Sequence, residues 1–276
     1  MFSDDDLLER LVLKGGNALD LVHRVTTRAS HDLDFSMERG FSTEELKGIR
    51  ARVEHRLLRT FTPAGYTVFD VLFEVVPKPS APDPMEFWGG YKLEFKVIDA
   101  DKFVELRGRP DDIRRQAIAF GPLDRRRFEI DISKFEYCKG KQVHSLDGLT
   151  IYVYTPAMVV CEKLRAICQQ MPEYVQFVKR QPASRARDFL DIHATIRRFG
   201  IDLGTTANHE LVINIFAAKH VPLHLLGEIP EHREFHRQSW PAVEATVRPS
   251  VRLKPFDFYF DFVAELCTQL HAHGDV

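Results

Sequence analysis

Two short motifs near the start of the chain carry residue types that would bind a nucleotide. Gly15 and Gly16 directly follow Lys14, and one residue separates Asp32 from Asp34 in the stretch HDLDFS. Carboxylates at positions i and i+2 of a strand project from the same face, where their oxygens suit Mg²⁺. A Gly-Gly turn at a helix start offers backbone N–H groups and a positive dipole end, which attract phosphate. Together the motifs predict a site for a nucleoside triphosphate and its metal ion.

The apolar pattern predicts the elements that must position these motifs. LLERLVL predicts a short helix running into a strand that ends near Lys14, NALDLVHRV has helical spacing, and HDLDFSM alternates as a strand does. Each motif alone has a simpler explanation, because Gly-Gly turns are often structural and an acidic pair on a strand is often a solvated edge. The order strand, glycines, helix, strand and acidic pair within about twenty residues makes the prediction more specific.

The rest of the chain predicts a mixed α and β region followed by a helical region. A long helix is expected from Ser42 to about Leu58, a short one from Asp111 to Ile118, and further strands at residues 66–76, 90–99, 126–133 and 149–155. After this point the spacing is helical, at residues 156–170, 185–199, 210–218, 230–247 and 256–271. The sequence therefore predicts an α+β fold: a domain at residues 1–155 with a mixed sheet of four or five strands flanked by helices, then a helical domain at residues 156–276.

The composition is that of an ordinary globular protein. The chain has 276 residues, 44% of them hydrophobic and 28% charged, with a formal net charge of −2. This balance gives no overall attraction to nucleic acid, and the apolar runs are too short for a membrane span. The first residues, MFSDDDLLER, are acidic where a secretory signal is basic, and the four cysteines form no CxxC pair. We therefore expect a cytoplasmic protein with reduced thiols, in which Cys161 and Cys168 serve packing.

LKGGNALDL and RASHDLDFS resemble the opening motif of nucleotidyltransferases of the DNA polymerase β-like superfamily. The chain more closely resembles the AbiEii/AbiGii-type toxin family of prokaryotic toxin–antitoxin and phage-defence systems. Asn17 stands after Gly-Gly where many superfamily members have Gly-Ser, and RASHDLDF is similar to the family's R-x-S-x-D-L-D-F. The resemblance extends to about His193 and implies a polymerase β-like nucleotidyltransferase domain. It also implies that the nucleotide contacts Lys14, Gly15, Gly16, Asn17, Arg28 and Ser30, although Lys14 would also fit as a plain strand-end lysine.

The resemblance implies a third metal-binding carboxylate on a neighbouring strand. Asp131 in RRFEIDIS fits the expected pattern, with Glu129 two residues earlier on the same face. Glu94 in YKLEFKV is the rival, because some family members use a similar strand there. Its simpler explanation is an outward strand residue paired with Lys92 or Lys96. We favour Asp131 as the third ligand beside Asp32 and Asp34.

Two helices of the C-terminal half carry further similarities to the family. CEKLRAI is similar to its E-K-L-x-A helix and RARDFLDIH to its R-x-R-D-x-x-D-[LI] helix. Lys163 would neutralise charge that builds on the triphosphate as the bond breaks. Asp188 and Asp191 share a helical face, where either would hold Lys163, a base or a ribose hydroxyl. Alternatively, Arg187 pairs with Asp191 and Lys163 with a surface acid.

A basic surface is a further hypothesis, since such a surface would bind an RNA backbone. A solvated charged face is the simpler explanation. The residues concerned are Arg107, Arg109, Arg114, Arg115, Arg125, Arg126, Arg127, Lys139 and Lys141. No histidine has metal-binding spacing with another, so we expect structural roles for His23, His31, His144 and His193.

The sequence therefore predicts a nucleotidyltransferase toxin that depends on Mg²⁺ or Mn²⁺ and attaches nucleotides from an NTP to an acceptor hydroxyl. Two metal ions held by the three carboxylates would stabilise in-line attack on the α-phosphorus, with release of pyrophosphate. The family implies RNA, the 3′ end of tRNA, as acceptor and an antitoxin protein as partner, with no role for a membrane. A metal-dependent nuclease or phosphohydrolase, and a catalytically silent nucleotide-binding module, are the alternatives.

Overall fold

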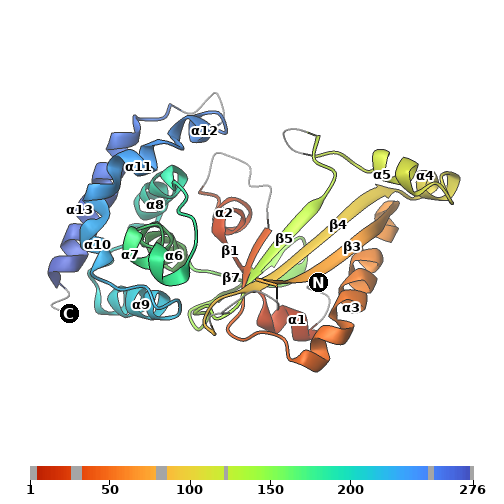
Figure 1. Cartoon of the computed structure of the whole chain (residues 1–276), viewed down its shortest axis with the longest axis horizontal. Helices are drawn as coiled ribbons and strands as arrows, with labels where there is room; N and C mark the ends of the chain where they lie inside the picture. The colour runs from red at the N-terminus through yellow and green to blue at the C-terminus, as the bar shows by residue number, and fades with distance from the viewer. Residues whose placement is uncertain (1–4, 26–32, 79–85, 121–123, 248–251, 274–276) are drawn as a thin grey trace. The chain divides into compact units, whose positions relative to one another are not determined.

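The computed structural model describes residues 5–25, 33–78, 86–120, 124–247 and 252–273 (Figure 1). The chain divides into two compact units, and each takes its residues from several stretches. The first unit comprises Met1–Leu13, His31–Phe135 and Val143–Tyr152, and the second comprises Lys14–Ser30, Glu136–Gln142 and Val153–Val276. The division at residue 155 that the sequence suggests stays a prediction.

A seven-stranded sheet, in the order β3-β4-β5-β2-β1-β7-β6, forms the centre of the first unit. Its strands are β1 (Val12–Lys14), β2 (Leu33–Ser36), β3 (Tyr66–Val76), β4 (Gly90–Asp99), β5 (Phe128–Ser133), β6 (Gln142–Leu146) and β7 (Leu149–Val153). β3, β4 and β5 pair antiparallel, whereas β2 pairs parallel with β5. The described residues thus hold more strands than the four or five expected. The missed strand β6 precedes a two-residue turn, Asp147-Gly148, in which both residues have positive φ, as a tight hairpin requires.

Four α-helices of the first unit are described: α1 (Asp5–Arg10), α3 (Thr43–Phe61), α4 (Ala100–Glu105) and α5 (Pro110–Arg115). The long helix α3 lies against β3 (Figure 1). Ser42 caps its first turn, because the Ser42 hydroxyl accepts the Glu45 backbone N–H and the Glu45 carboxylate accepts that of Ser42. Ile49, Val53 and Leu57 recur every four residues and form its buried face.

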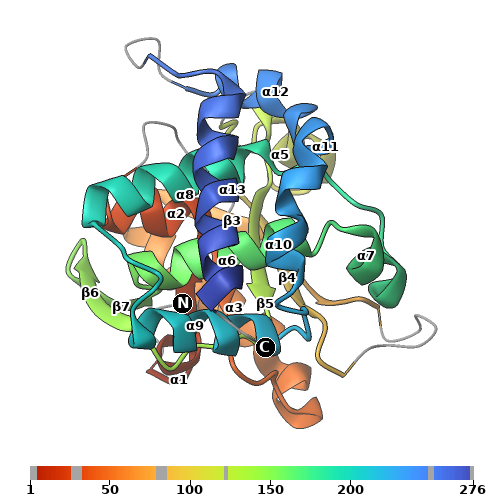
Figure 2. The same cartoon turned by 90° about the vertical axis from the view of Figure 1, so that its left-hand side faces the viewer.

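The second unit begins at Lys14 and is otherwise mainly helical. Its described helices are α2 (Gly15–Asn17), the π-helix η1 (Ala18–Val22), α6 (Pro156–Cys168), α7 (Pro172–Val178), α8 (Ala186–Phe199), α9 (Thr206–Ala217), α10 (Leu225–Glu228), α11 (Arg233–Arg237), α12 (Trp240–Glu244) and α13 (Phe256–His273). α6 packs against α8, α9 and α10, and α13 packs against α8 and α10 (Figure 2). Thr155 caps α6, since its hydroxyl accepts the Met158 N–H at 3.1 Å, and Pro156 fits the first turn.

One expected helix is wrong. The periodicity predicts a single helix over residues 230–247, but the structure has a 3₁₀ turn at Ile229–His232 and two short helices, α11 and α12. Pro230 lies in the turn and Pro241 in the first turn of α12. Proline lacks the N–H that a continuous helix needs, so it starts a helix well but interrupts one.

All four cysteines lie in the second unit, and none forms a disulfide. Cys161 and Cys168 are completely buried on α6, as expected of packing residues. Within the described helices, none combines the length and apolar character needed to cross a membrane. The predicted α+β class, a mixed sheet with flanking helices, is confirmed.

Candidate active site

Asp34 and Asp131 lie side by side in the sheet of the first unit. β2 and β5 are parallel neighbours, and Asp34 is in register with Asp131. In-register residues on adjacent strands project from the same face, about 4.8 Å apart. Asp34 is half-buried and Asp131 is exposed. Asp32 falls outside the described residues.

The same face carries the rival carboxylate in a different environment. In the β4–β5 register, Lys92 lies opposite Asp131 and Glu94 opposite Glu129. The Lys92 ammonium is 3.0 Å from Glu94 Oε1 and 3.1 Å from Glu129 Oε2, and Arg127 donates to Glu94 at 2.7 Å. These carboxylates, Glu94 first, raise the pKa of Lys92. Glu94 is thus a buried carboxylate that binds two cations. One of them is Lys92, the partner that a purely structural role for Glu94 predicts.

The predicted glycine turn lies where β1 ends. Lys14 is extended, Gly15 has φ of +65°, and the backbone is helical from Gly15 through η1. A positive φ favours glycine, so the backbone conformation at position 15 accounts for Gly15. Asn17 is buried in the first turn. Arg28 and Ser30 fall outside the described residues.

Lys14 belongs to a buried cluster of five charged side chains in the second unit. Lys14 Nζ is 2.6 Å from Glu162 Oε1 and 3.5 Å from Glu136 Oε1. Arg165 pairs with Glu136 at 2.7 Å, and Lys219 lies 3.6 Å from the same carboxylate. Burial alone would lower the pKa of Lys14, but Glu136 and Glu162 raise it above its ordinary value. Burial lowers the pKa of Lys219 to about 8.

Lys163 projects from α6 towards α8 and contacts both predicted carboxylates. Its Nζ is 2.7 Å from Asp188 Oδ1 and 2.8 Å from Asp191 Oδ2, and all three side chains are buried. Arg185 donates to the other oxygen of Asp188 at 2.6 Å. Burial opposes ionisation, yet Arg185 and Lys163 hold the pKa of Asp188 well below its usual range. The partners of Lys163 are therefore buried acids rather than surface acids, while its catalytic role stays a prediction.

The start of α8 is capped by residues from the α11–α12 region. The Arg185 N–H donates to His236 Nδ1 at 3.1 Å, and the Ala186 N–H donates to Ser239 Oγ at 3.2 Å. Burial lowers the pKa of His236 to about 4, so the ring is neutral at physiological pH. This cap fixes the first turn of α8, which carries Asp188.

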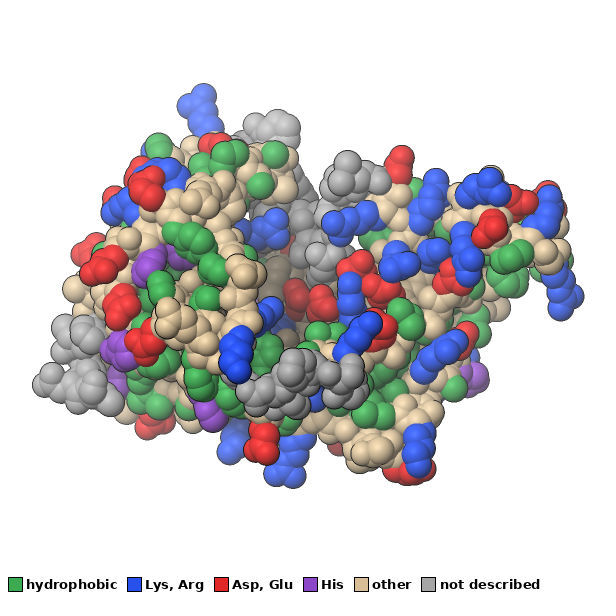
Figure 3. Space-filling view, viewed as in Figure 1, with side chains coloured by type: hydrophobic (Ala, Val, Ile, Leu, Met, Phe, Trp, Pro, Cys, Tyr) green, Lys and Arg blue, Asp and Glu red, His purple; other side chains and the backbone are tan. Residues whose placement is uncertain are grey.

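The arginines on α5 and in the segment between α4 and α5 do not form a purely basic surface. Arg114 donates to Asp70 at 2.9 Å, and Arg115 donates to Asp112 at 2.9 Å. Acidic and basic side chains are interspersed over these helices (Figure 3). Lys139 and Lys141 belong to the second unit, whereas the arginines belong to the first. The RNA-binding surface stays a prediction.

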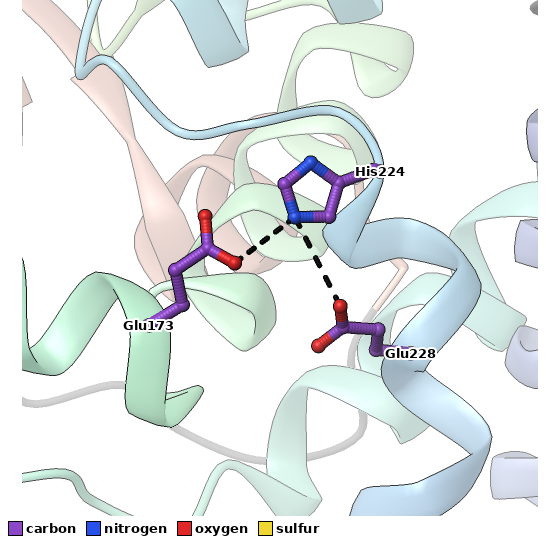
Figure 4. Close-up of side chains that lie close together, drawn as sticks. All are labelled: Glu173, His224 and Glu228. Carbon is purple, nitrogen blue, oxygen red and sulfur yellow. Dashed lines mark hydrogen bonds and ion pairs between the residues drawn. The ribbon is translucent and has the colours of Figure 1, made fainter.

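One histidine–carboxylate group among the described residues has metal-like spacing (Figure 4). His224 Nε2 lies 3.1 Å from Glu173 Oε2 and 3.9 Å from Glu228 Oε1. Glu173 and His224 are exposed, and the imidazole accounts for both contacts as an ordinary surface interaction. His23 has a structural contact, as expected, since its Nε2 is 2.7 Å from the Tyr154 carbonyl oxygen.

Sequence reasoning did not anticipate several of these residues. They are Glu136, Glu162, Arg165, Lys219 and His236. Glu162 stands directly before Lys163 in the quoted CEKLRAI stretch, so its spacing was available as a signal. Arg165 stands in the same stretch, three residues after Glu162, with which it pairs. The partners of Glu136, Lys219 and His236 are distant in sequence, so these residues carry no local signal.

The family model described as nucleotidyl transferase AbiEii toxin, type IV TA system, matches residues 1–262. No curated protein matches the chain significantly. Among solved structures, JHP933 from Helicobacter pylori is 14% identical, with 97% of this chain and 86% of that chain covered and a TM-score of 0.45. A candidate nucleotidyltransferase from H. pylori is 13% identical, with 97% and 89% covered and a TM-score of 0.47. An antigenic nucleotidyltransferase-like protein from Paracoccidioides brasiliensis is 13% identical, with 90% and 91% covered and a TM-score of 0.36.

The family match spans nearly the whole chain, including the glycine turn, the strand carboxylates and the α6–α8 ion pairs. It confirms the family and the enzyme class that the opening motif predicts. Nucleotidyltransferases generally use an NTP and a divalent metal ion, and a type IV toxin–antitoxin family implies an antitoxin partner. The chain belongs to the AbiEii nucleotidyltransferase toxin family.

Proposed function

We propose that this protein transfers a nucleotide from an NTP to a hydroxyl group of RNA, with the 3′ end of tRNA as acceptor and Mg²⁺ as metal ion. The observation that carries the proposal is the register of Asp34 with Asp131 on neighbouring parallel strands. Two neighbouring carboxylates on one face are a donor set that suits metal-dependent phosphoryl transfer. Both substrates are cytoplasmic molecules, so we expect the activity there.

The residues at this face fit a hard divalent cation. Asp34 and Asp131 offer only oxygen ligands, which suit Mg²⁺ or Mn²⁺, and Asp32 is expected to add a third carboxylate. When bound, the metal ion would make the α-phosphorus electrophilic and stabilise charge on the departing pyrophosphate. Asp131 is in register with Asp34 and exposed, whereas Glu94 is buried, which supports Asp131 as the third ligand.

The chain's own groups would then perform the remaining steps. Asp131 accepts the proton of the acceptor hydroxyl as its oxygen bonds to the α-phosphorus and the bond to the bridging oxygen of pyrophosphate breaks. The N–H groups of Gly15 and Gly16 donate to phosphate oxygens. Lys163 is buried between Asp188 and Asp191, so its part in this proposal is to hold α6 against α8 rather than to contact the triphosphate. That these groups act on one nucleotide stays a prediction.

Incubation of the purified protein with total RNA, Mg²⁺ and each α-labelled NTP in turn tests this function. We expect label in RNA together with pyrophosphate release. Asp131→Asn should lower incorporation by about a hundredfold or more, because it removes stabilisation of transition-state charge. Glu129→Gln is the matched control, since Glu129 lies on the same strand and face but pairs with Lys92. It should retain most of the activity.

The outcomes separate the alternatives. RNA cleavage without incorporation would identify a nuclease, and release of free phosphate without pyrophosphate would identify a phosphohydrolase. Label in protein rather than RNA would refute the proposal that RNA is the acceptor. Equal activity of the Asp131→Asn and Glu129→Gln variants would refute the metal site. Co-expression of a neighbouring antitoxin gene should relieve the toxicity of the active protein and leave the Asp131→Asn variant harmless with or without it.

A further inference from the structure

Lys14 stands directly before the glycine turn, but its ammonium group is bound inside the protein. Lys14 is 7% exposed, and its Nζ lies 2.6 Å from Oε1 of Glu162 on α6. A lysine that binds a phosphate must offer its ammonium to a ligand. Here the ammonium already neutralises a carboxylate that is itself largely buried.

The cluster around this pair has little freedom to rearrange. Glu136 accepts from Arg165 at 2.7 Å and lies within ion-pair distance of Lys14 and Lys219. Arg165 also lies 3.6 Å from Glu162 and donates to the Ile215 carbonyl at 3.2 Å. If Lys14 left the cluster for a phosphate, Glu162 would lose its closest cation in a buried environment, which is costly.

The pair also joins two predicted parts of the nucleotide site within the second unit. Glu162 and Lys163 are consecutive on α6. Glu162 contacts the residue before Gly15, whereas Lys163 contacts Asp188 and Asp191 on α8. One turn of α6 therefore contacts the residue before the glycine turn, through Glu162, and also carries Lys163.

We propose that Lys14 is a positioning residue, whose ion pair with Glu162 fixes the backbone of Gly15 and Gly16 for phosphate binding, rather than a ligand of the phosphate. This inference rests on the proposed function for its ligand, an NTP. Lys14 then acts through the N–H groups of the turn, and Glu162 is as necessary to nucleotide binding as Lys14.

A double-mutant cycle on the full-length protein tests the proposal. The variants are Lys14→Met, Glu162→Gln and the double variant, and the measurement is the Kd of α,β-methylene NTPs with Mg²⁺ by equilibrium dialysis. Each single variant should raise Kd about tenfold, because small displacements of positioning groups have effects of this size or larger. The double variant should lie within about threefold of either single variant, because both remove one shared interaction.

Glu162→Gln alone discriminates between the two roles of Lys14. If Lys14 were a phosphate ligand, neutralising Glu162 would release the ammonium, and NTP binding would stay the same or become tighter. That result would overturn the proposal. Glu162→Gln is the mildest change of the cycle, so this comparison decides the question even if Lys14→Met does not fold.

Lys219→Met is the matched control for general damage to the cluster. It removes a buried cation that contacts the same Glu136 carboxylate, but Lys219 follows α9 and not the glycine turn. It should lower the urea midpoint as Lys14→Met does, yet keep Kd within about twofold of wild type. An equal loss of NTP binding in Lys219→Met would overturn the positioning role.

Measuring NTP binding in the absence of RNA separates the role proposed for Lys14 from the proposed transfer to RNA. A wild-type protein that binds an NTP analogue but labels no RNA would refute the proposed RNA reaction, while the cycle would still decide the role of Lys14. A wild-type protein that binds none of the four analogues would overturn both.

Discussion

Two charged sites, one in each unit, differ in how far they are exposed to solvent. On the first unit's sheet, Asp34 is half-buried and Asp131 is exposed, and both lie on one face. On α6 and α8 of the second unit, Lys163 and Asp188 are buried at 2.7 Å from each other. An open carboxylate can exchange water for a metal ion, whereas a buried ion pair maintains one geometry. The sheet is thus suited to exchangeable ligands and the helical unit to fixed orientation.

Removing the buried Lys163 ammonium should give the largest change, a loss of folding stability. Lys163→Met would leave Asp188 and Asp191 buried without their shared ammonium, although Arg185 would still contact Asp188. We expect the free energy of unfolding to fall by about 3–5 kcal/mol, measured by urea denaturation. Lys47→Met is the control, because Lys47 forms an exposed pair with Glu44 on α3 and should leave the midpoint nearly unchanged. Equal midpoints for both variants would mean that burial does not distinguish the two kinds of pair.

The acid side of the pH–stability curve gives a second, smaller test. The pKa of His236 is lowered from 6.5 to about 4, so the unfolded chain takes up a proton there before the folded chain does. Stability should therefore be fully present above pH 6.5 and decline as the pH falls towards 4, by about 2–3 kcal/mol from this group. The titratable and charged groups that act on the ring are His232, Asp188 and Arg185.

The measurement is urea unfolding at pH 6.5 and pH 4.5. His236→Gln can still accept the Arg185 N–H and should flatten the dependence. His55→Gln, on the exposed side of α3, should keep the wild-type slope. A wild-type slope in His236→Gln would show that another group is responsible.

Removing the positive charge of Lys92, next to Asp131, should give the smallest effect of the three, a change in metal binding. Lys92 lies opposite Asp131 and neutralises Glu94 and Glu129. Lys92→Met should therefore tighten the binding of the proposed metal ion about two- to fivefold, since an exposed charge at this range contributes on the order of 1 kcal/mol. Calorimetric titration with Mn²⁺ measures this, with Lys96→Met on the same strand as control, because Lys96 pairs with Asp70. Weaker binding in Lys92→Met would contradict the expectation.

Local patterns were sufficient for much of the fold. The strand–glycine–helix order at Lys14 and the starts of α6 and α13 follow from spacing, prolines and glycines within a few residues. The β6–β7 hairpin was missed although Asp147-Gly148 is a strong turn signal, because β6 alternates weakly and is mostly exposed. The single helix expected at residues 230–247 does not form, because Pro230 and Pro241 interrupt the helix that the apolar spacing predicts.

The charged cluster around Lys14 shows why part of the site is beyond sequence reasoning. Lys14 is separated by 122 residues from Glu136 and by 148 residues from Glu162. No local rule relates positions so far apart, and whether a lysine points to solvent or into a protein depends on tertiary packing. The motif identified Lys14 as a residue of interest, but only the contacts suggest what it does.

The four buried cysteines allow the opening of the second unit to be measured separately by thiol modification. Cys138, Cys161, Cys168 and Cys267 all belong to it and are at most 4% exposed. Burial also raises the pKa of Cys161 to about 12, which suppresses the reactive thiolate. A thiol reagent should therefore modify the protein only at the rate at which the second unit opens. Alkylation kinetics followed by mass spectrometry would then time the opening of the helical unit alone, without a label or an engineered probe.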